Sequence, residues 1–333
     1  MRRMRLWGAV MVIASVLWAT GASAQQYTMR AGSIWARSHS IGQGYDKFAE
    51  LVKQKSNGRV VVQVFHESAL GNEREMTENL RLGNLEILGT GGPGLGRFVP
   101  EADIPEFPFL YENMAQAMKV WDKFDVELEK ISKPKGFKIL ASFHQGTRFI
   151  ISRKPLRSMD DMKGYRLRSP ESPFYIGMIK SWGATPIPMP FAEIYTSLQT
   201  GVIDGMEGPP ITIWSSKYHE PAKNLILTGH ILTGQRMVMN ATYYDKLPAD
   251  IKKILHEAVA EAMAWQRDLG QKLEDELVGK IRAAGVTVIT PDAAFRSGLV
   301  KASHQFNKEF AEKMGSKAVE LYGILQKMIS ETK

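Results

Sequence analysis

The glycines at residues 89–94 read GTGGPG and match the spacing G-x-G-x-x-G. In a dinucleotide site such glycines let the backbone approach the phosphates, and a helix that opens directly after the strand points its N-terminus at them. Pro93, Gly96 and Pro100 disfavour that helix. We therefore predict a flexible loop at the edge of a cleft, whose bare backbone can approach a ligand, and no nucleotide site.

Other chemical motifs are missing from the sequence. The seven histidines show neither H-E-x-x-H nor another close metal-ligand spacing, so the sequence does not support a metal centre. Without cysteine there is no thiol nucleophile, thiolate ligand or disulfide. No G-x-S-x-G elbow is present, and scattered Ser, His and Asp residues carry no signal by themselves. We expect no cofactor, and an exported hydrolase or lyase acting on an acidic small molecule stays as the alternative function.

The charge pattern is mildly basic and dispersed. The formal net charge is +8, and about +5 remains once three arginines near the N-terminus are set aside. Lys and Arg are interspersed with Asp and Glu, whereas a nucleic-acid-binding protein usually shows a clustered basic stripe with aromatic residues. We therefore expect no nucleic-acid partner, and the basic excess favours solubility and the attraction of anions to a cleft.

The N-terminus has the three parts of a secretory signal peptide. Basic residues precede an apolar run from Leu6 to Trp18, and Ala22 and Ala24 supply small residues at a cleavage site. A permanent membrane anchor is disfavoured because this run is shorter than the roughly 20 residues that a spanning helix needs. We expect cleavage after Ala24 and a mature protein in the periplasm.

The mature chain is long enough for two domains, since a single core stops growing at about 250–300 residues. Apolar runs with a period of two alternate with runs of helical spacing, which predicts α/β units with a largely parallel sheet. The expected strands and helices include residues 27–34, 41–56, 60–65, 72–83, 85–88, 137–143, 149–152, 172–182, 194–198 and 202–206. Asn72 followed by Glu75 is typical of a capping box at a helix start.

A long amphipathic pattern follows Pro248. Apolar residues recur every three or four positions up to Gly285, which predicts a helix of about 50 Å at 1.5 Å per residue. That length exceeds the width of one small lobe. The helix either breaks near Gly270 or Gly279 or lies across both lobes as a strut, and we favour the strut because glycine inside a helix costs only about 1 kcal/mol.

Long ordered motifs point to a known family. They are FAELVKQKSNGRVVVQVF at 48–65, ALGNERE at 69–75, LRLGNLEIL at 80–88, GTR at 146–148, MKGYRLRSP at 162–170, GATPIPMPFAEIYTSLQTGVIDGMEGP at 183–209 and LTGH at 227–230. In these segments the chain resembles the solute receptors of tripartite ATP-independent periplasmic (TRAP) transporters, of the C4-dicarboxylate-binding type. The resemblance covers nearly the whole mature chain.

This resemblance implies a fold and a function. The expected fold is a two-lobed periplasmic binding protein, or Venus flytrap, with a long helix along both lobes. Residues 25–145 plus about 234–273 would form lobe I, and residues 146–233 plus about 274–333 would form lobe II. The implied function is capture of a small carboxylate by a monomeric receptor that delivers it to integral-membrane permease subunits. Dicarboxylates, keto or hydroxy acids, sugar acids and aromatic acids all remain open as ligands.

The resemblance also implies a carboxylate-binding pair of arginines. The family's main arginine falls on the second arginine of the KGxxxR-type motif, Arg168, and a second one falls on Arg148, whereas Arg166 should be exposed. A planar guanidinium donates two parallel hydrogen bonds to one carboxylate and stays charged in a closed cleft. The alternative is that Arg168 pairs with an internal acid such as Glu171 or Glu207.

Other positions carry less support from the motifs. Phe191 matches an aromatic position that packs on the ligand, and Glu73 matches an acidic position that reaches the cleft, with core packing and helix capping as alternatives. Gly208 replaces an Asn, and Gly91 an acid, of the sialic-acid-specific members, so sialic acid is not expected. The complete set of candidate ligand-binding residues is Arg168, Arg148, Phe191, Glu73, Trp35, Glu171, Glu207, Gly208 and Trp214.

Overall fold

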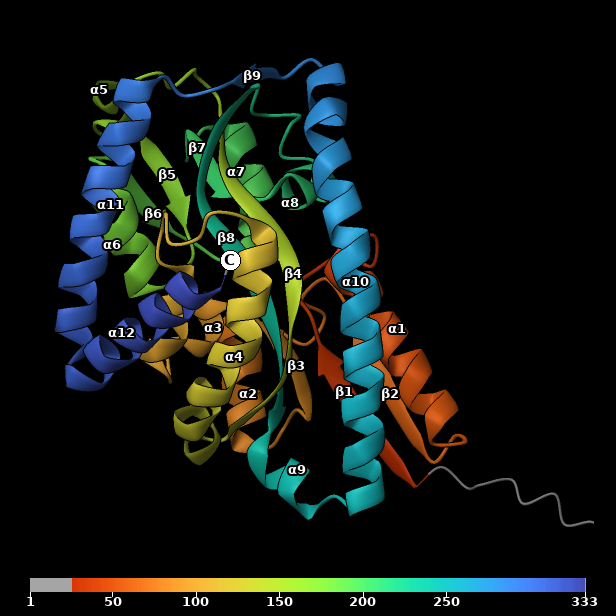
Figure 1. The fold of residues 1–333 in the computed structure, drawn as a ribbon. Helices are drawn as coiled ribbons and strands as arrows, with labels where there is room; N and C mark the ends of the chain where they lie inside the picture. The colour runs from red at the N-terminus through yellow and green to blue at the C-terminus, as the bar shows by residue number, and fades with distance from the viewer. Residues whose placement is uncertain (1–25, 333) are drawn as a thin grey trace, which may run out of the picture.

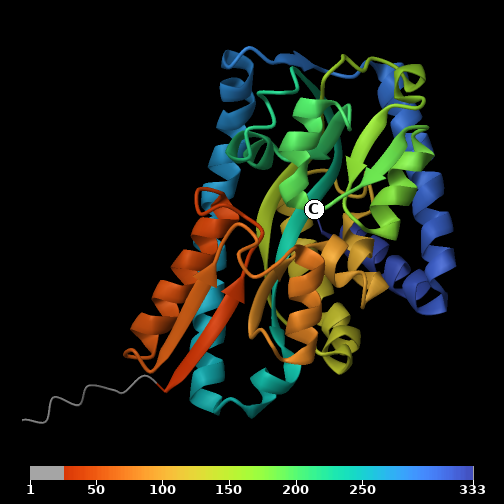
Figure 2. The ribbon, with the colours of Figure 1, turned by 180° about the vertical axis from the view of Figure 1, so that it is seen from behind.

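The computed structural model describes residues 26–332, so the expected signal peptide at 1–24 lies outside the described residues. Over this range the strands form one mixed sheet with the order β2-β1-β3-β8-β4-β7-β5-β6, and β9 pairs with β8. Helices lie on both faces of the sheet (Figures 1 and 2). The α/β class predicted from the sequence is confirmed.

The first part of the sheet is parallel and is built from strand–helix units. Its elements are β1 (Tyr27–Gly32), α1 (Ser40–Lys55), β2 (Val60–Phe65), α2 (Glu73–Leu82) and β3 (Ile87–Thr90). The capping box is present, because Asn72 accepts from the Glu75 backbone while the Glu75 side chain accepts from the Asn72 backbone. Gly83 ends α2 with φ 83°, a left-handed conformation that favours glycine.

Two long antiparallel strands, β4 (Phe137–Ser152) and β8 (Asn224–Asn240), run through the whole molecule (Figure 1). The strands predicted at 137–143 and 149–152 are confirmed, but they are parts of one continuous strand, β4. The polar run between them continues the ladder with β8 through register shifts, one of them between His144 and Gly146. Such bulges bend a strand without ending it.

The second part of the sheet lies beyond these long strands. Its elements are α5 (Met159–Met162), β5 (Arg166–Ser169), α6 (Pro173–Ser181), β6 (Thr185–Pro188), η3 (Phe191–Glu193), α7 (Ile194–Thr200), β7 (Gly205–Gly208), α8 (Pro210–Ser215) and β9 (Thr287–Ile289). The strand predicted at 202–206 begins three residues later, at Gly205. β5 pairs in parallel with β6 and β7, so the carboxyl ends of these strands meet at one edge.

The predicted strut is confirmed as α10 (Ala249–Ala283), a continuous helix of 35 residues. It packs on α1 and β4 and, further along, on α8 of the second part (Figure 1). Gly270 is an interior residue of this helix rather than a break. A Cβ at this position would lie 2.2 Å from Nδ1 of His144, so glycine allows the helix to approach β4 closely.

Side chains of α10 also hold the middle of β4. Gln266 accepts from the His144 N–H at 2.9 Å and donates to the His144 carbonyl at 2.7 Å. Glu274 accepts from the Thr147 N–H at 2.9 Å. These bonds fix the segment where the chain passes from one part of the molecule to the other.

The remaining elements complete the two lobes. They are α3 (Gly92–Leu95), η1 (Pro100–Glu106), α4 (Met114–Ser132), η2 (Lys133–Lys135), α9 (Ala241–Lys246), α11 (Ala293–Met314) and α12 (Ser316–Glu331). The short helix α3 occupies the segment predicted as a flexible loop. α11 packs on α6, but α12 packs on α4 and η1, and Gln116 Nε2 donates to the Thr332 carbonyl at 2.8 Å. The division into lobes by residue ranges stays a proposal. In it α12 belongs to lobe II, although it packs on α4 and η1 of lobe I.

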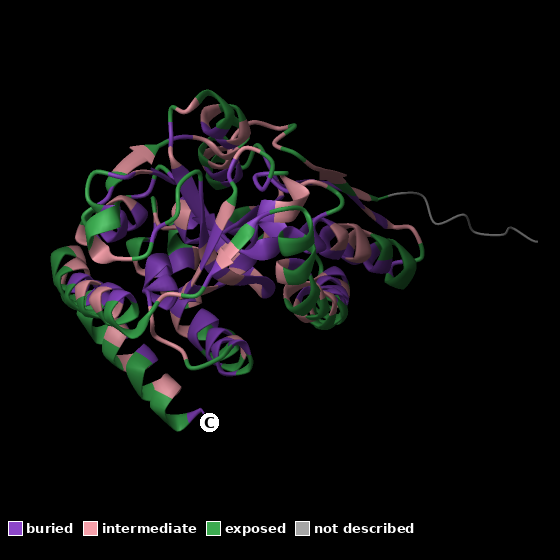
Figure 3. Cartoon of the chain, turned by 90° about the horizontal axis from the view of Figure 1, so that it is seen from above, coloured by how far each residue is buried: buried purple, intermediate pink, exposed green. Residues whose placement is uncertain are grey.

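Buried residues follow the sheet through the centre of the molecule, and the outer faces of the helices are exposed (Figure 3). Across residues 26–332, every helix is too short or too polar to cross a membrane.

Candidate functional site

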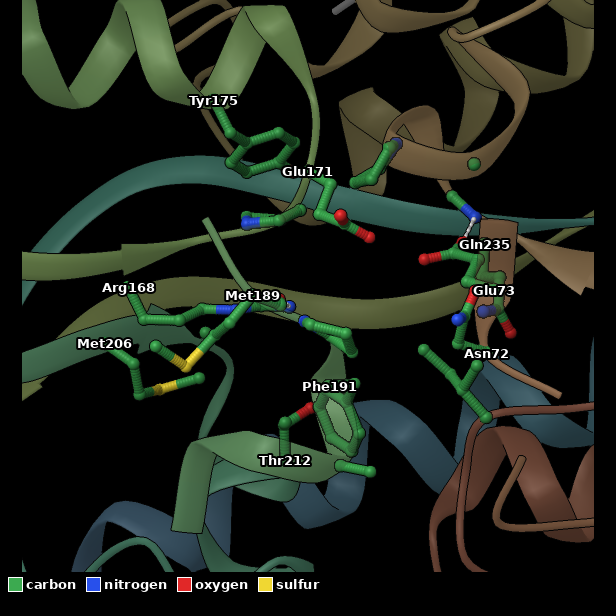
Figure 4. A pocket seen from close by; sticks show the side chains of 18 of the residues that line it. Asn72, Glu73, Arg168, Glu171, Tyr175, Met189, Phe191, Met206, Thr212 and Gln235 are labelled. Carbon is green, nitrogen blue, oxygen red and sulfur yellow. Dashed lines mark hydrogen bonds between the residues drawn. The ribbon is translucent and has the colours of Figure 1, made fainter. Parts of the chain in front are cut away.

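A cavity of about 330 Å³ lies between the two parts of the molecule. Its walls come from the loops after β1 and β5, from α3, from the start of α2, from η3 and α8, from β7, and from the middle of β4 and β8. The volume is at the lower end of the range for small-molecule sites, roughly 300–1,000 Å³. Figure 4 shows side chains from both lobes converging on this space.

Arg168 is a buried cation without a carboxylate partner. It sits near the carboxyl end of β5, is 6% exposed and lines the cavity. Its Nη2 donates to the Met189 carbonyl at 3.0 Å, whereas Nε has no hydrogen-bond partner. Burial lowers the pKa of Arg168 because it disfavours the charged form. Arg166, two residues earlier, is half-exposed and pairs with Asp204.

The other buried arginines in the described part of the chain are already paired. Arg236 binds Asp125 at 2.7 Å, and Arg148 binds Glu207 through Nε at 2.5 Å and Nη2 at 2.6 Å. Glu207, which was considered as an internal partner for Arg168, therefore pairs with Arg148 instead. This leaves Arg168 as the buried arginine whose charge an incoming anion can balance.

Arg148 and Glu207 belong to a buried network beneath the cavity. Burial alone would raise the pKa of Glu207, but Arg148 and, to a smaller extent, His230 together outweigh burial and lower it to about 2. Burial likewise lowers the pKa of Arg148, and Glu207 outweighs this and raises it. His230 Nε2 lies 3.2 Å from Glu207 Oε2, and the Tyr175 ring lies 5.2 Å from the Arg148 guanidinium carbon. Both charges are therefore neutralised internally, although both residues line the cavity.

The side of the cavity opposite Arg168 carries oxygen acceptors (Figure 4). Glu73 opens α2, and its Oε1 accepts from the Thr90 hydroxyl at 2.9 Å and the Gly91 N–H at 3.2 Å. Burial raises the pKa of Glu73. Gln235 of β8 is 1% exposed, and its Oε1 has no hydrogen-bond partner.

Glu106 is a second acid on this side, and sequence reasoning missed it. It accepts from the Gly92 N–H at 3.0 Å and from the Tyr175 hydroxyl at 2.5 Å. Glu106 ends η1 and Gln235 lies within β8, two elements that were not predicted from the sequence. Only the tertiary structure brings them to the cavity beside Glu73.

Aromatic rings form the wall between these two sides. Trp35 stacks on His39 with 4.3 Å between ring centroids and meets the edge of Phe191 at 5.1 Å. His39 Nδ1 accepts from the Ile41 N–H, so Nε2 carries the proton and donates to the Thr212 hydroxyl at 3.3 Å. This bond joins the N-cap residue of α1 to α8.

Three further candidates differ in position. Glu171 is an exposed residue at the rim, and Gly208 lines the cavity through its backbone. Trp214 is not among the residues that line the cavity. Its ring stacks on His219 with 4.6 Å between centroids, and its contact with the ligand stays a prediction.

The sequence of this chain is similar to those of known solute-binding proteins. Residues 31–314 match the family described as "Bacterial extracellular solute-binding protein, family 7". The "2,3-diketo-L-gulonate-binding periplasmic protein YiaO" of Escherichia coli (strain K12) is 33% identical over 265 residues, which cover 79% of this chain and 81% of that protein.

Two solved structures share the fold. A TRAP periplasmic solute binding protein from Haemophilus influenzae RdAW, with bound L-gulonate, has a TM-score of 0.87 and 26% identity over 92% of this chain and 100% of that one. One from Desulfovibrio salexigens, with bound orotic acid, has a TM-score of 0.88 and 30% identity, with the same coverage of 92% and 100%. The two-lobed fold predicted from the sequence is confirmed.

Proposed function

Because the chain belongs to family 7 of the bacterial extracellular solute-binding proteins, we propose that it holds a small organic acid between its lobes with the carboxylate on Arg168. The family is that of the TRAP receptors, which work with membrane permeases, so the resemblance seen in the sequence motifs is confirmed. The residue assignment is our own.

The unpaired charge of Arg168 carries this proposal. A buried charge without a partner is unfavourable, and two of the three buried arginines in the described range avoid it by pairing with a carboxylate. A ligand carboxylate accepting from the free Nε and from a terminal N–H would complete the third pair. Phe191 and Trp35 would then cover the bound acid and keep water from it.

The ligands of the similar proteins support the same class of compound. L-gulonate, 2,3-diketo-L-gulonate and orotic acid each carry one carboxylate. We extend the family's role to this chain as a monomeric periplasmic receptor, exported by cleavage after Ala24, that passes its acid unchanged to permease subunits.

A ligand screen tests the proposal against the alternative of an exported hydrolase or lyase. Thermal shifts are measured with sugar acids, dicarboxylates, keto or hydroxy acids and aromatic acids, because a ligand raises the melting temperature by mass action. Any acid that stabilises the protein is incubated with it, and the compound released on denaturation is identified by mass spectrometry. We expect recovery of the unaltered acid. Stabilisation by none of the acids, or recovery of a converted product, would contradict the proposed function.

A further inference from the structure

The cavity has two chemically different ends. Arg168 lies at one end, while Glu73 and Gln235 lie at the other (Figure 4), and Glu106 is next to Glu73. Resting on the proposed function, we further propose that the acceptor end, formed by Glu73, Glu106 and Gln235, selects monocarboxylates with hydroxyl groups remote from the carboxylate. The same end excludes acids that place a second carboxylate there.

Both acids at this end are held as hydrogen-bond acceptors. Burial raises the pKa of Glu73, and its two donors, a hydroxyl and a backbone N–H, oppose this by favouring the charged form. Its place in the first turn of α2 acts in the same direction as these donors through the helix dipole. Glu106 accepts from the N–H of Gly92, the next residue after Gly91, and from the Tyr175 hydroxyl. Consecutive backbone N–H groups thus bring the two carboxylates side by side.

Gln235 adds an acceptor that nothing in the described protein satisfies. Gln235 lines the cavity, and its Oε1 is buried without a hydrogen-bond partner. A buried acceptor in this state is unfavourable until a donor reaches it. A ligand hydroxyl can donate to an amide or carboxylate oxygen, whereas a second ionised carboxylate has no proton to donate and is repelled by Glu73 and Glu106.

The second buried guanidinium that lines the cavity, that of Arg148, is not free for a dicarboxylate. It donates to both carboxylate oxygens of Glu207. Arg74 and Arg97 also line it, and both are exposed, where solvent and salt screen their charge. Opposite charges at the two ends of the cavity therefore fix the orientation of the bound acid, with its carboxylate on Arg168 and its hydroxyls toward Glu73.

Galactonate and galactarate test this inference as a matched pair of ligands. They share the same carbon chain and hydroxyl pattern and differ at C6, which is a CH2OH group in galactonate and a carboxylate in galactarate. Isothermal titration calorimetry of the wild-type protein should give a Kd at least tenfold lower for galactonate.

Glu73→Gln removes the charge and keeps an acceptor oxygen for the Thr90 hydroxyl and the Gly91 N–H. This variant should narrow the ratio of the two Kd values at least fivefold. Glu78→Gln is the control, because it removes the same charge from an exposed position on α2, where Glu78 pairs with Arg81. It should leave the ratio unchanged.

Four results of these titrations would contradict either the inference or the proposed function. Equal or tighter binding of galactarate by the wild type, or an unchanged ratio in Glu73→Gln, overturns the inference. Binding of orotic acid or succinate but of neither matched acid also overturns it, while the proposed function stands. Binding of no acid at all overturns the proposed function and this inference with it.

Discussion

Replacing Arg168 with methionine should remove most of the affinity for acids and leave the unliganded protein about as stable as the wild type. Methionine fills a similar volume with flexible apolar atoms. Two opposing effects act on the free protein. The variant loses a buried charge that lacks a carboxylate, and it loses the hydrogen bond to the Met189 carbonyl. We expect the free energy of unfolding to change by no more than about 1 kcal/mol.

The loss of binding follows from the missing guanidinium. Removing one partner of a buried, hydrogen-bonded charge pair costs about 2–5 kcal/mol. At 1.4 kcal/mol per tenfold, the Kd should rise by roughly 30-fold to a few thousand-fold. Arg148→Met should behave in the opposite way, because it strands the buried Glu207 carboxylate and should lower the free energy of unfolding by about 3–5 kcal/mol.

Urea denaturation and calorimetry with an acid from the screen separate these outcomes. Arg166→Met is the matched control, since this arginine lies on the same strand but pairs with Asp204 at the surface, and its Kd should not change. The reasoning would be refuted by an unchanged Kd in Arg168→Met, or by a loss of stability as large as that of Arg148→Met.

Two further predictions concern packing and pH. Gly270→Ala should lower the free energy of unfolding by about 1–3 kcal/mol despite the better helix propensity of alanine, because its Cβ meets His144, whereas Gly279→Ala in open space should be neutral or stabilising in the same urea experiment. Equal effects at both glycines would contradict the close approach of α10. The Glu207 carboxyl has a folded pKa of about 2 against an ordinary 4.5, so its stabilisation is present above about pH 4.5 and lost as the pH falls toward 2. This loss is on the order of 3 kcal/mol. The stability of Glu207→Gln, in which Arg148 keeps an amide acceptor, should therefore fall less over that pH range, and parallel curves for variant and wild type would count against the ion pair.

Local signals in the sequence predicted the elements that depend on neighbouring residues. The capping box at Asn72 and the helix that ends at Gly83 need only contacts within a few positions. The strut α10 was predictable because its apolar spacing is regular over 35 residues. The family motifs singled out Arg168, and its unpaired Nε supports this assignment, which stays a proposal.

Features that depend on distant residues were not predictable in this way. The polar residues from His144 to Arg148 look like a break in β4, but they face α10 and the cavity, so the hydrophobic pattern fails while the ladder continues. Arg148 and Glu207 are 59 positions apart, and no local pattern links them. Gln235 reaches the cavity only because β8 crosses both lobes.

The shared strands also constrain how such a receptor can change its ligand. Because β4, β8 and α10 each run through both lobes, a cut at any lobe boundary would divide a strand or a helix and leave neither half with a complete sheet edge. We therefore expect that exchanging one lobe between related proteins would disrupt this sheet, and that new specificity is more easily reached by substitution of individual side chains around the cavity.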